Sequence, residues 1–188
     1  MGDSSAELFP YTRFMPRTAS NSFEVDWTNL QILHYGYLEW QSVLRNNPWA
    51  TRGANIPEAL TEAIVCLCTG GKLKTGTKGD ILLPDSRIGE VKATTLDRND
   101  LTSFSPNSPF DNLYFVRFLF SDPNKYSVYD LQMNRDDLYN FKMNEYETFG
   151  EQAEDKRRPR FSIIENIINP KNLTPTWVVL MSEKKIIK

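Results

Sequence analysis

The chain has 188 residues, of which 40% are hydrophobic and 24% charged; this composition fits one globular domain spanning 1–188 and excludes a wholly disordered chain. Its net charge of −2 and pI of about 5.5 argue against a protein that coats nucleic acid through bulk positive charge, but not against a nuclease with metal-binding carboxylates. Because the sequence has neither a run of 18 apolar residues nor a basic leader followed by an apolar run, we expect no membrane span and no secretory signal.

The two cysteines, Cys66 and Cys68, are two residues apart. On a helix this spacing points the side chains in different directions, so a structural disulfide is not expected. The single histidine, His34, is far away in sequence and surrounded by aromatic residues, which favours a buried structural residue over a zinc ligand. We therefore expect two reduced thiols in a cytoplasmic protein.

The chain is predicted to begin with an irregular arm at 1–22, followed by a long helix. Between Asp26 and Asn46 the apolar residues recur every three or four positions, and Asn46-Asn47-Pro48 is a stop signal. This stripe is predicted to pack in the core, with a dimer contact as the alternative; its members are Trp27, Leu30, Leu33, Tyr37, Trp40 and Leu44.

A second helix is predicted from the segment Asn55-Ile56-Pro57-Glu58. Asn55 can cap the helix, Pro57 suits the first turn, and Glu58 completes an Asn-x-x-Glu capping box. The helix should reach about Thr69, before Gly70-Gly71.

Further along, alternating and apolar runs predict a set of strands. Strands are expected at 79–83, 88–95, 113–120, 126–131 and 177–181, a turn at 84–87, and a short helix at 136–143. Residues 97–111 are polar and turn-rich, and 161–168 could be helix or strand. The order predicts an α/β (α+β) fold with a central mixed sheet flanked by helices.

Three polar residues on the predicted hairpin carry the chemistry: Asp80, Glu90 and Lys92. Glu90 and Lys92 are two apart, so they share one face of a strand while Val91 points to the buried side. Asp80 joins them if Leu83 pairs with Gly89 around a three-residue tip at 85–87, whereas a slip of one residue would move it to the other face.

This residue set suits phosphodiester hydrolysis with Mg²⁺. Asp80 and Glu90 can supply the carboxylates that Mg²⁺ prefers, and the main-chain carbonyl of Val91 lies between the two side chains of its strand as a further ligand. Lys92 can orient or deprotonate the attacking water and stabilise developing negative charge. An unrelated strand pair with a solvated polar face would show the same spacing.

The pattern Asp80…Glu90-Val91-Lys92, on a hairpin after a helix, resembles the PD-(D/E)xK nuclease core. With residues around it, the chain also resembles a small family of type II restriction endonucleases associated with the interrupted site GCNGC; the similar segments are 57–66, 79–81, 90–95, 101–106 and 156–161. Ser105 before Pro106, and Pro84 within the hairpin, depart from that pattern. The resemblance implies a helix glutamate beside the metal, either Glu58 or Glu62, and we favour Glu62 as an outer metal residue.

Residues that could contact DNA form two groups. Arg157, Arg158 and Arg160 make the densest basic run, which can read guanine or bind phosphate, with a solvated face as the alternative. Thr102, Ser103 and Ser105 supply hydroxyl donors on a loop after the catalytic strand, with an ordinary loop as the alternative. Weaker candidates are Lys78, Asn99 and Asn107, and Arg13 and Arg17 in the arm.

Three functions remain open on the sequence. The first is a type II restriction endonuclease, acting with Mg²⁺ as a homodimer on a palindromic site in double-stranded DNA. The second is a structure-selective repair or recombination nuclease of the same fold. The third is a non-catalytic DNA-binding module in which Asp80, Glu90 and Lys92 are incidental.

Overall fold

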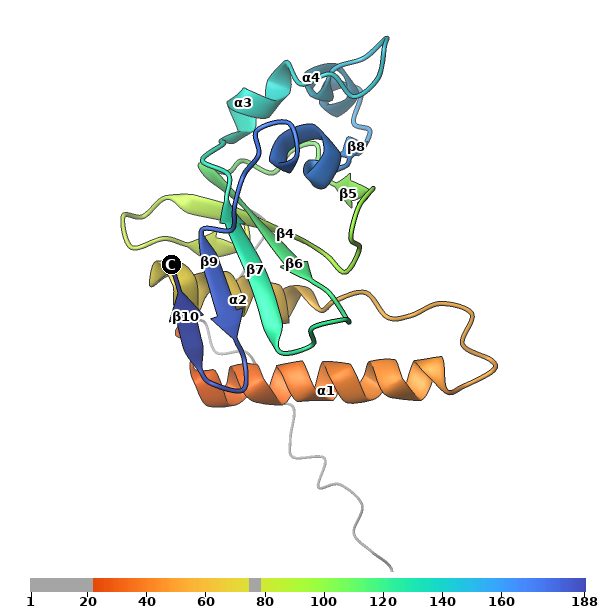
Figure 1. The fold of residues 1–188 in the computed structure, drawn as a ribbon. Helices are drawn as coiled ribbons and strands as arrows, with labels where there is room; N and C mark the ends of the chain where they lie inside the picture. Colours follow the sequence, from red (N-terminus) through yellow and green to blue (C-terminus); the bar gives the residue numbers. More distant parts are fainter. Residues whose placement is uncertain (1–21, 75–78) are drawn as a thin grey trace, which may run out of the picture.

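A computed structural model describes residues 22–74 and 79–188. The arm predicted at 1–22, which contains Arg13 and Arg17, lies outside the described residues except for Ser22. The candidate DNA contact Lys78 also lies outside them. An eight-stranded sheet has the helices α1 and α2 on one side, and a group of smaller elements extends beyond one end of it (Figure 1).

The sheet is mixed, as predicted. Its order is β1-β2-β3-β4-β6-β7-β9-β10, and only β4 and β6 are parallel neighbours. The strands are β1 (Ser22–Phe23), β2 (Lys72–Lys74), β3 (Ile81–Leu82), β4 (Ile88–Thr94), β6 (Asn112–Phe118), β7 (Lys125–Asp130), β9 (Trp177–Leu180) and β10 (Lys185–Ile187). The five predicted strands are all present, but β1, β2 and β10 were not predicted.

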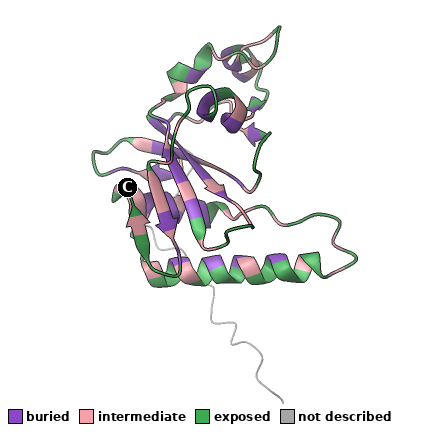
Figure 2. Ribbon diagram, viewed as in Figure 1, coloured by how far each residue is buried: buried purple, intermediate pink, exposed green. Residues whose placement is uncertain are grey.

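Helix α1 (Trp27–Arg45) confirms the first predicted helix. Asp26 caps it by accepting a hydrogen bond from the Asn29 amide. Leu30 and Tyr37 are buried, whereas Leu33 is 42% and Trp40 54% exposed. The expectation that the whole aromatic stripe packs in the core was therefore wrong for its outer half, because the sheet and α2 cover only one side of this helix (Figure 2).

Helix α2 (Glu58–Thr69) also has the predicted position, but not the predicted cap. Pro57 occupies the cap position in an extended conformation, with no side-chain hydrogen bond to the helix. A residue before proline avoids the helical region, so the helix cannot extend back towards Asn55. The capping box between Asn55 and Glu58 does not form, and Glu58 is left exposed at the first position.

Two hydrophobic clusters lie on opposite faces of the sheet. In the central strand β6, Tyr114 and Val116 point into the cluster formed with α1 and α2, whereas Leu113 and Phe115 point into a second cluster. This alternation is the period of two expected for a strand buried on both faces. The second cluster is built largely from the smaller elements that the sequence indicated poorly.

These smaller elements are α3 (Arg135–Tyr139), α4 (Phe149–Glu154), a π-helix (Ile164–Ile168) and the paired strands β5 (Thr102–Ser103) and β8 (Arg160–Phe161). The helix predicted at 136–143 is shorter and starts one residue earlier, and α4 was missed. Segment 161–168, which could be helix or strand, contains the end of one strand and then a helix.

The predictions for the two cysteines and for the histidine agree with the structure. Both cysteines are free, and burial raises the pKa of each thiol to about 12. His34 is buried, with Nδ1 2.8 Å from the Tyr126 hydroxyl. Within residues 22–74 and 79–188, no helix is long and apolar enough to cross a membrane.

Candidate active site

The β3–β4 hairpin places Asp80 beside Glu90, through a register that differs from the predicted one. Ile81 pairs with Gly89, so the predicted pairing of Leu83 with Gly89 was wrong by two residues. The three-residue tip is 84–86 instead of 85–87, since the Leu83 amide donates to the Arg87 carbonyl and Ser86 adopts a left-handed conformation. Pro84 suits the second position of such a turn, where its fixed φ fits and no N–H is needed. A shift of two keeps every side chain on its predicted face.

Two glycines allow the close approach of the strands at this point. Gly79 has φ +66, and a Cβ there would lie 2.1 Å from the Ile88 side chain. At Gly89 a Cβ would lie 2.6 Å from the Ile81 side chain. Without these side chains, the Asp80 amide donates to the Gly89 carbonyl at 2.9 Å, and Asp80 Oδ2 accepts from the Val91 amide at 2.7 Å.

Glu90 and Lys92 form an ion pair on one face of β4. Lys92 Nζ lies 2.6 Å from Glu90 Oε1, and their side chains are 20% and 5% exposed. The ammonium group also lies 5.4 Å from the centre of the Phe104 ring, so it contacts the second hydrophobic cluster. Val91 between them is buried against the first cluster, as predicted. A buried carboxylate and a nearly buried ammonium are thus held at a short, fixed distance.

Glu62 on α2 belongs to the same electrostatic environment. Burial, followed by the charges of Asp80 and Glu58, raises the Glu62 pKa to about 7. Burial, followed by the charge of Glu90, raises the Asp80 pKa to about 6. Like charges that repel each other in a partly buried site bind a cation favourably.

The donor set suits a Mg²⁺ ion held by few protein ligands. Among the described residues, no three acidic, histidine or cysteine side chains form a ready metal cage. Mg²⁺ typically keeps several waters and takes only one or two protein carboxylates, and Asp80 and Glu90 provide such a pair. Glu62 then fits a place outside the direct ligands.

A cleft of about 510 Å³ is lined by Lys92 and by residues of the segments around it. The start of α2 lines it through Glu58 and Thr61, β4 lines it through Lys92, and the segment after β4 lines it through Leu101 and Ser103. Leu101 is 67% exposed. The cleft therefore reaches the Glu90–Lys92 pair through Lys92.

The structure brings together the two groups of predicted DNA contacts. Strands β5 and β8 pair Thr102 with Phe161 and Ser103 with Arg160, so the hydroxyl-bearing loop lies beside the basic run. Arg158 and Arg160 are exposed and form no ion pair within the described part of the chain. Arg157 instead pairs with Glu147 at 2.5 Å and Asp155 at 3.1 Å.

The remaining candidate DNA contacts differ in whether their side chains are free to bind. The Thr102 hydroxyl donates to buried Asp100 at 2.6 Å, so it is occupied within the protein. Ser105 and Asn107 are exposed, and the exposed Asn99 lies in the segment between β4 and β5.

Three residues near the site were not anticipated from the sequence. Asp100 accepts hydrogen bonds from the Ser162 hydroxyl and from the Ile163 and Ile164 amides, which ties the loop after β4 to the π-helix. The Ser108 hydroxyl is 3.4 Å from Glu90 Oε2, and Arg135 binds the loop that carries Ser108. These contacts join segments far apart in the chain, so no local sequence signal indicates them.

Comparison with known proteins decides the family. The profile of the Bsp6I restriction endonuclease matches residues 25–170. The chain belongs to the Bsp6I restriction endonuclease family. A curated relative, the type II restriction enzyme Bsp6I of Bacillus sp. (strain RFL6), is 38% identical over 156 residues, which cover 82% of this chain and 88% of the relative. No solved structure matches the chain. As a member of the Bsp6I family the chain is a sequence-specific restriction endonuclease, a site-specific deoxyribonuclease, and the matched region includes the whole β3–β4 hairpin.

Proposed function

We propose that this restriction endonuclease cleaves double-stranded DNA with a PD-(D/E)xK site in which Asp80, Glu90 and Lys92 are catalytic. One observation carries the proposal: Asp80 lies beside Glu90 in the hairpin, and Lys92, which lines a cleft, has its Nζ 2.6 Å from the Glu90 carboxylate. The family shows the activity, and this is the constellation near a cleft that has the chemistry for it.

The proposed cofactor is Mg²⁺. The Asp80 and Glu90 carboxylates and the Val91 main-chain carbonyl would hold the ion, with Glu62 outside these ligands. When bound, the ion would neutralise charge on the phosphate and activate water. The raised pKa values of Asp80 and Glu62 support this proposal, because burial and then the neighbouring carboxylates disfavour the ionised forms of both groups, and a bound cation would offset both effects.

Lys92 has two proposed tasks. Its ammonium, held between the Glu90 carboxylate and the Phe104 ring, can donate to an attacking water and orient it towards phosphorus. The same charge stabilises the negative charge that develops on the phosphate oxygens. Because the lysine is only 20% exposed, it is held in one orientation and water screens its charge weakly.

DNA recognition is proposed to involve the β5–β8 pair and the segments next to it. Arg158 and Arg160 are candidates to read bases or bind phosphate, and Ser103 and Ser105 can donate hydrogen bonds beside them. The ion pairs of Arg157 favour a structural role there, with DNA contact as the alternative. The target to test first is the interrupted site GCNGC, associated with the family that the sequence resembles.

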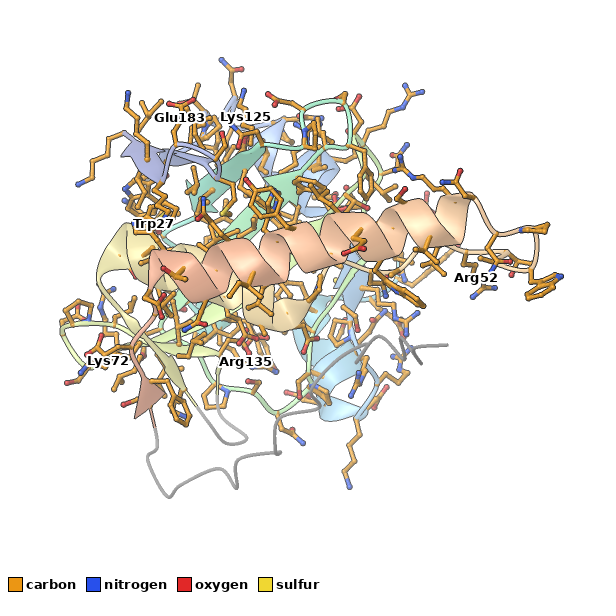
Figure 3. All side chains as sticks on the ribbon, turned by 90° about the horizontal axis from the view of Figure 1, so that it is seen from below. Trp27, Arg52, Lys72, Lys125, Arg135 and Glu183 are labelled. Carbon is orange, nitrogen blue, oxygen red and sulfur yellow. The ribbon has the colours of Figure 1, made fainter. Side chains whose placement is uncertain are left out.

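A homodimer is proposed because a duplex has two strands and the described chain has one such site. Leu33, Gly36, Trp40 and Val43 recur on α1 at intervals of three, four and three, which is the spacing of two packed helices. This face is exposed, and nothing lies within 4 Å of a Cβ built at Gly36 (Figure 3 shows α1 between Trp27 and Arg52).

Trp40→Glu should shift the sedimenting species from dimer to monomer; a wild-type monomer at all concentrations would contradict the proposal.

The decisive experiment incubates purified protein with unmethylated plasmid DNA in Mg²⁺ or EDTA, alongside Glu90→Gln, and sequences the ends. We expect discrete Mg²⁺-dependent fragments that share one end sequence, and none with Glu90→Gln. Structure-selective nicking would favour a repair or recombination nuclease. Site-specific binding without any cleavage in varied metals would favour a binding module.

A further inference from the structure

Arg135, at the start of α3, holds the loop at 105–108 by its main chain. Its Nη1 donates to the carbonyl oxygens of Ser105 at 3.0 Å and Ser108 at 3.3 Å, and its Nη2 donates to the Pro106 carbonyl. One guanidinium therefore satisfies three carbonyls of a four-residue turn. The planar, forked group of arginine can do this, whereas the compact ammonium of lysine cannot match the same geometry.

Arg135 is itself fixed by the second hydrophobic cluster. Its guanidinium lies 5.1 Å from the centre of the Phe149 ring on α4, and its amide donates to the Phe110 carbonyl. The side chain is labelled in Figure 3. The loop is thus attached to packed elements and does not depend on its own short sequence for its shape.

The far end of this loop reaches the catalytic carboxylate. The Ser108 hydroxyl donates to Glu90 Oε2 at 3.4 Å, a long hydrogen bond, while Glu90 Oε1 is 2.6 Å from Lys92 Nζ. Each oxygen of Glu90 therefore has its own partner, and the two partners come from different segments. A carboxylate held at both oxygens has one orientation, whereas loss of either contact frees it to rotate.

We propose that Arg135 is a positioning residue for the reaction: by clamping the carbonyls of residues 105–108, it holds the Ser108 hydroxyl against Glu90 and sets the orientation of that carboxylate. The inference rests on the proposed catalytic role of Glu90. Hydrogen-bond partners just outside a metal site orient its ligands, and their loss typically lowers metal affinity or activity by about 10- to 100-fold.

The test compares Arg135→Lys, Ser108→Ala and the double variant with the wild type. Arg87→Lys is the matched control, because Arg87 lines the same surface hollow as Arg135 but pairs with Asp85 at the exposed hairpin tip. For each protein, one measures the melting temperature, DNA affinity in EDTA, Ca²⁺ affinity by calorimetry without DNA, and the single-turnover cleavage rate in Mg²⁺.

We expect both single variants to slow cleavage about 10- to 100-fold and to weaken Ca²⁺ binding about 10-fold, with unchanged DNA affinity. The melting temperature should be unchanged in Ser108→Ala, and any decrease in Arg135→Lys should be too small to leave protein unfolded at the assay temperature. The double variant should be no slower than the slower single variant, because both substitutions remove the same contact. The Arg87→Lys control should behave as wild type.

Two results would overturn the inference. Wild-type cleavage and Ca²⁺ binding by Ser108→Ala would show that the hydroxyl does not orient Glu90. If the slower cleavage of Arg135→Lys were fully explained by a lower melting temperature, Arg135 would have only a structural role. Glu90→Gln separates this failure from that of the proposed function. If Glu90→Gln still cleaves DNA, the proposed catalytic site is wrong. If Glu90→Gln is inactive but Ser108→Ala cleaves as wild type, only the positioning role of Arg135 is wrong.

Discussion

Asp80→Asn should abolish cleavage and yet stabilise the metal-free protein at pH 8. The wild-type carboxyl is half-buried near Glu90, so its pKa is raised from 3.8 to about 6. At a pH between these two pKa values, Asp80 is protonated in the folded protein but has lost its proton in the unfolded chain. Stability is therefore lost as the pH rises through this window, and the loss is complete above it. Asparagine does not ionise and avoids this loss.

The size of the gain follows from the pKa change. A rise of about two in pKa corresponds to about 3 kcal/mol, and screening by solvent reduces this to about 1–2 kcal/mol. For a chain of this length each 1 kcal/mol moves the melting temperature by about 2–4 °C. Asp80→Asn should therefore melt a few degrees higher than wild type at pH 8 in EDTA.

Thermal unfolding at pH 4 and pH 8 tests this reasoning. The difference between Asp80→Asn and wild type should disappear near pH 4, where Asp80 is protonated in the folded protein, and Mg²⁺ should stabilise the wild type more than the variant. Asp85→Asn is the control on the same hairpin, because its exposed carboxylate is paired with Arg87 and has a lowered pKa. An Asp80→Asn protein that is no more stable than wild type at pH 8, or equally more stable at both pH values, would refute the argument.

Three further substitutions probe the proposed catalytic lysine, a candidate DNA contact and the loop after β4. Lys92→Ala should slow single-turnover cleavage by at least about 10²-fold, while gel-shift affinity for the cognate site stays near wild type. An unchanged cleavage rate would contradict the proposed role of Lys92. Arg158→Ala should weaken the free energy of binding to the cognate DNA by about 1–3 kcal/mol and relax specificity at one base position, as measured by competition binding. Equally weaker binding to every DNA sequence would instead indicate a phosphate contact. Asp100→Asn should lower the free energy of unfolding by about 1–3 kcal/mol, because a buried acceptor of several hydrogen bonds loses its charge; denaturant unfolding measures this, and an unchanged midpoint would contradict it.

The face on which each side chain of the β3–β4 hairpin lies could be predicted, because side chains alternate strictly between the two faces of a strand. Asp80, Glu90 and Lys92 stay on their faces under any register shift of two, so the error in the turn did not disturb the site. The turn itself was misplaced by one residue, because a left-handed Ser86 is less expected than a left-handed glycine. Helix α1 was also predictable, from the periodicity of its apolar residues and the stop signal that begins at Asn46.

The second hydrophobic cluster could not be predicted in this way. Its elements are as short as the two-residue strands β5 and β8 and the five-residue α3, too short for a periodic pattern to emerge. They are held by contacts between distant residues, such as Asp100 with the Ser162 hydroxyl. The predicted capping box of α2 failed for the opposite reason, since a favourable local pattern at Asn55 was overruled by the backbone restriction before Pro57.

Strand β4 lies between the two clusters, so these unpredicted elements contact the proposed catalytic residues. Its inward residue Val91 is fixed by the α1–α2 side, whereas Lys92 lies against Phe104 and Glu90 contacts Ser108, both on the other side. Phe104 stacks on Phe161 at 5.2 Å, and Phe161 is paired with the strand that carries the candidate DNA contacts. A shift of β8 on binding DNA would therefore reach Lys92 through two packed rings. If β5 and β8 contact DNA as proposed, the contacts that hold the smaller elements together connect that surface to the proposed catalytic pair.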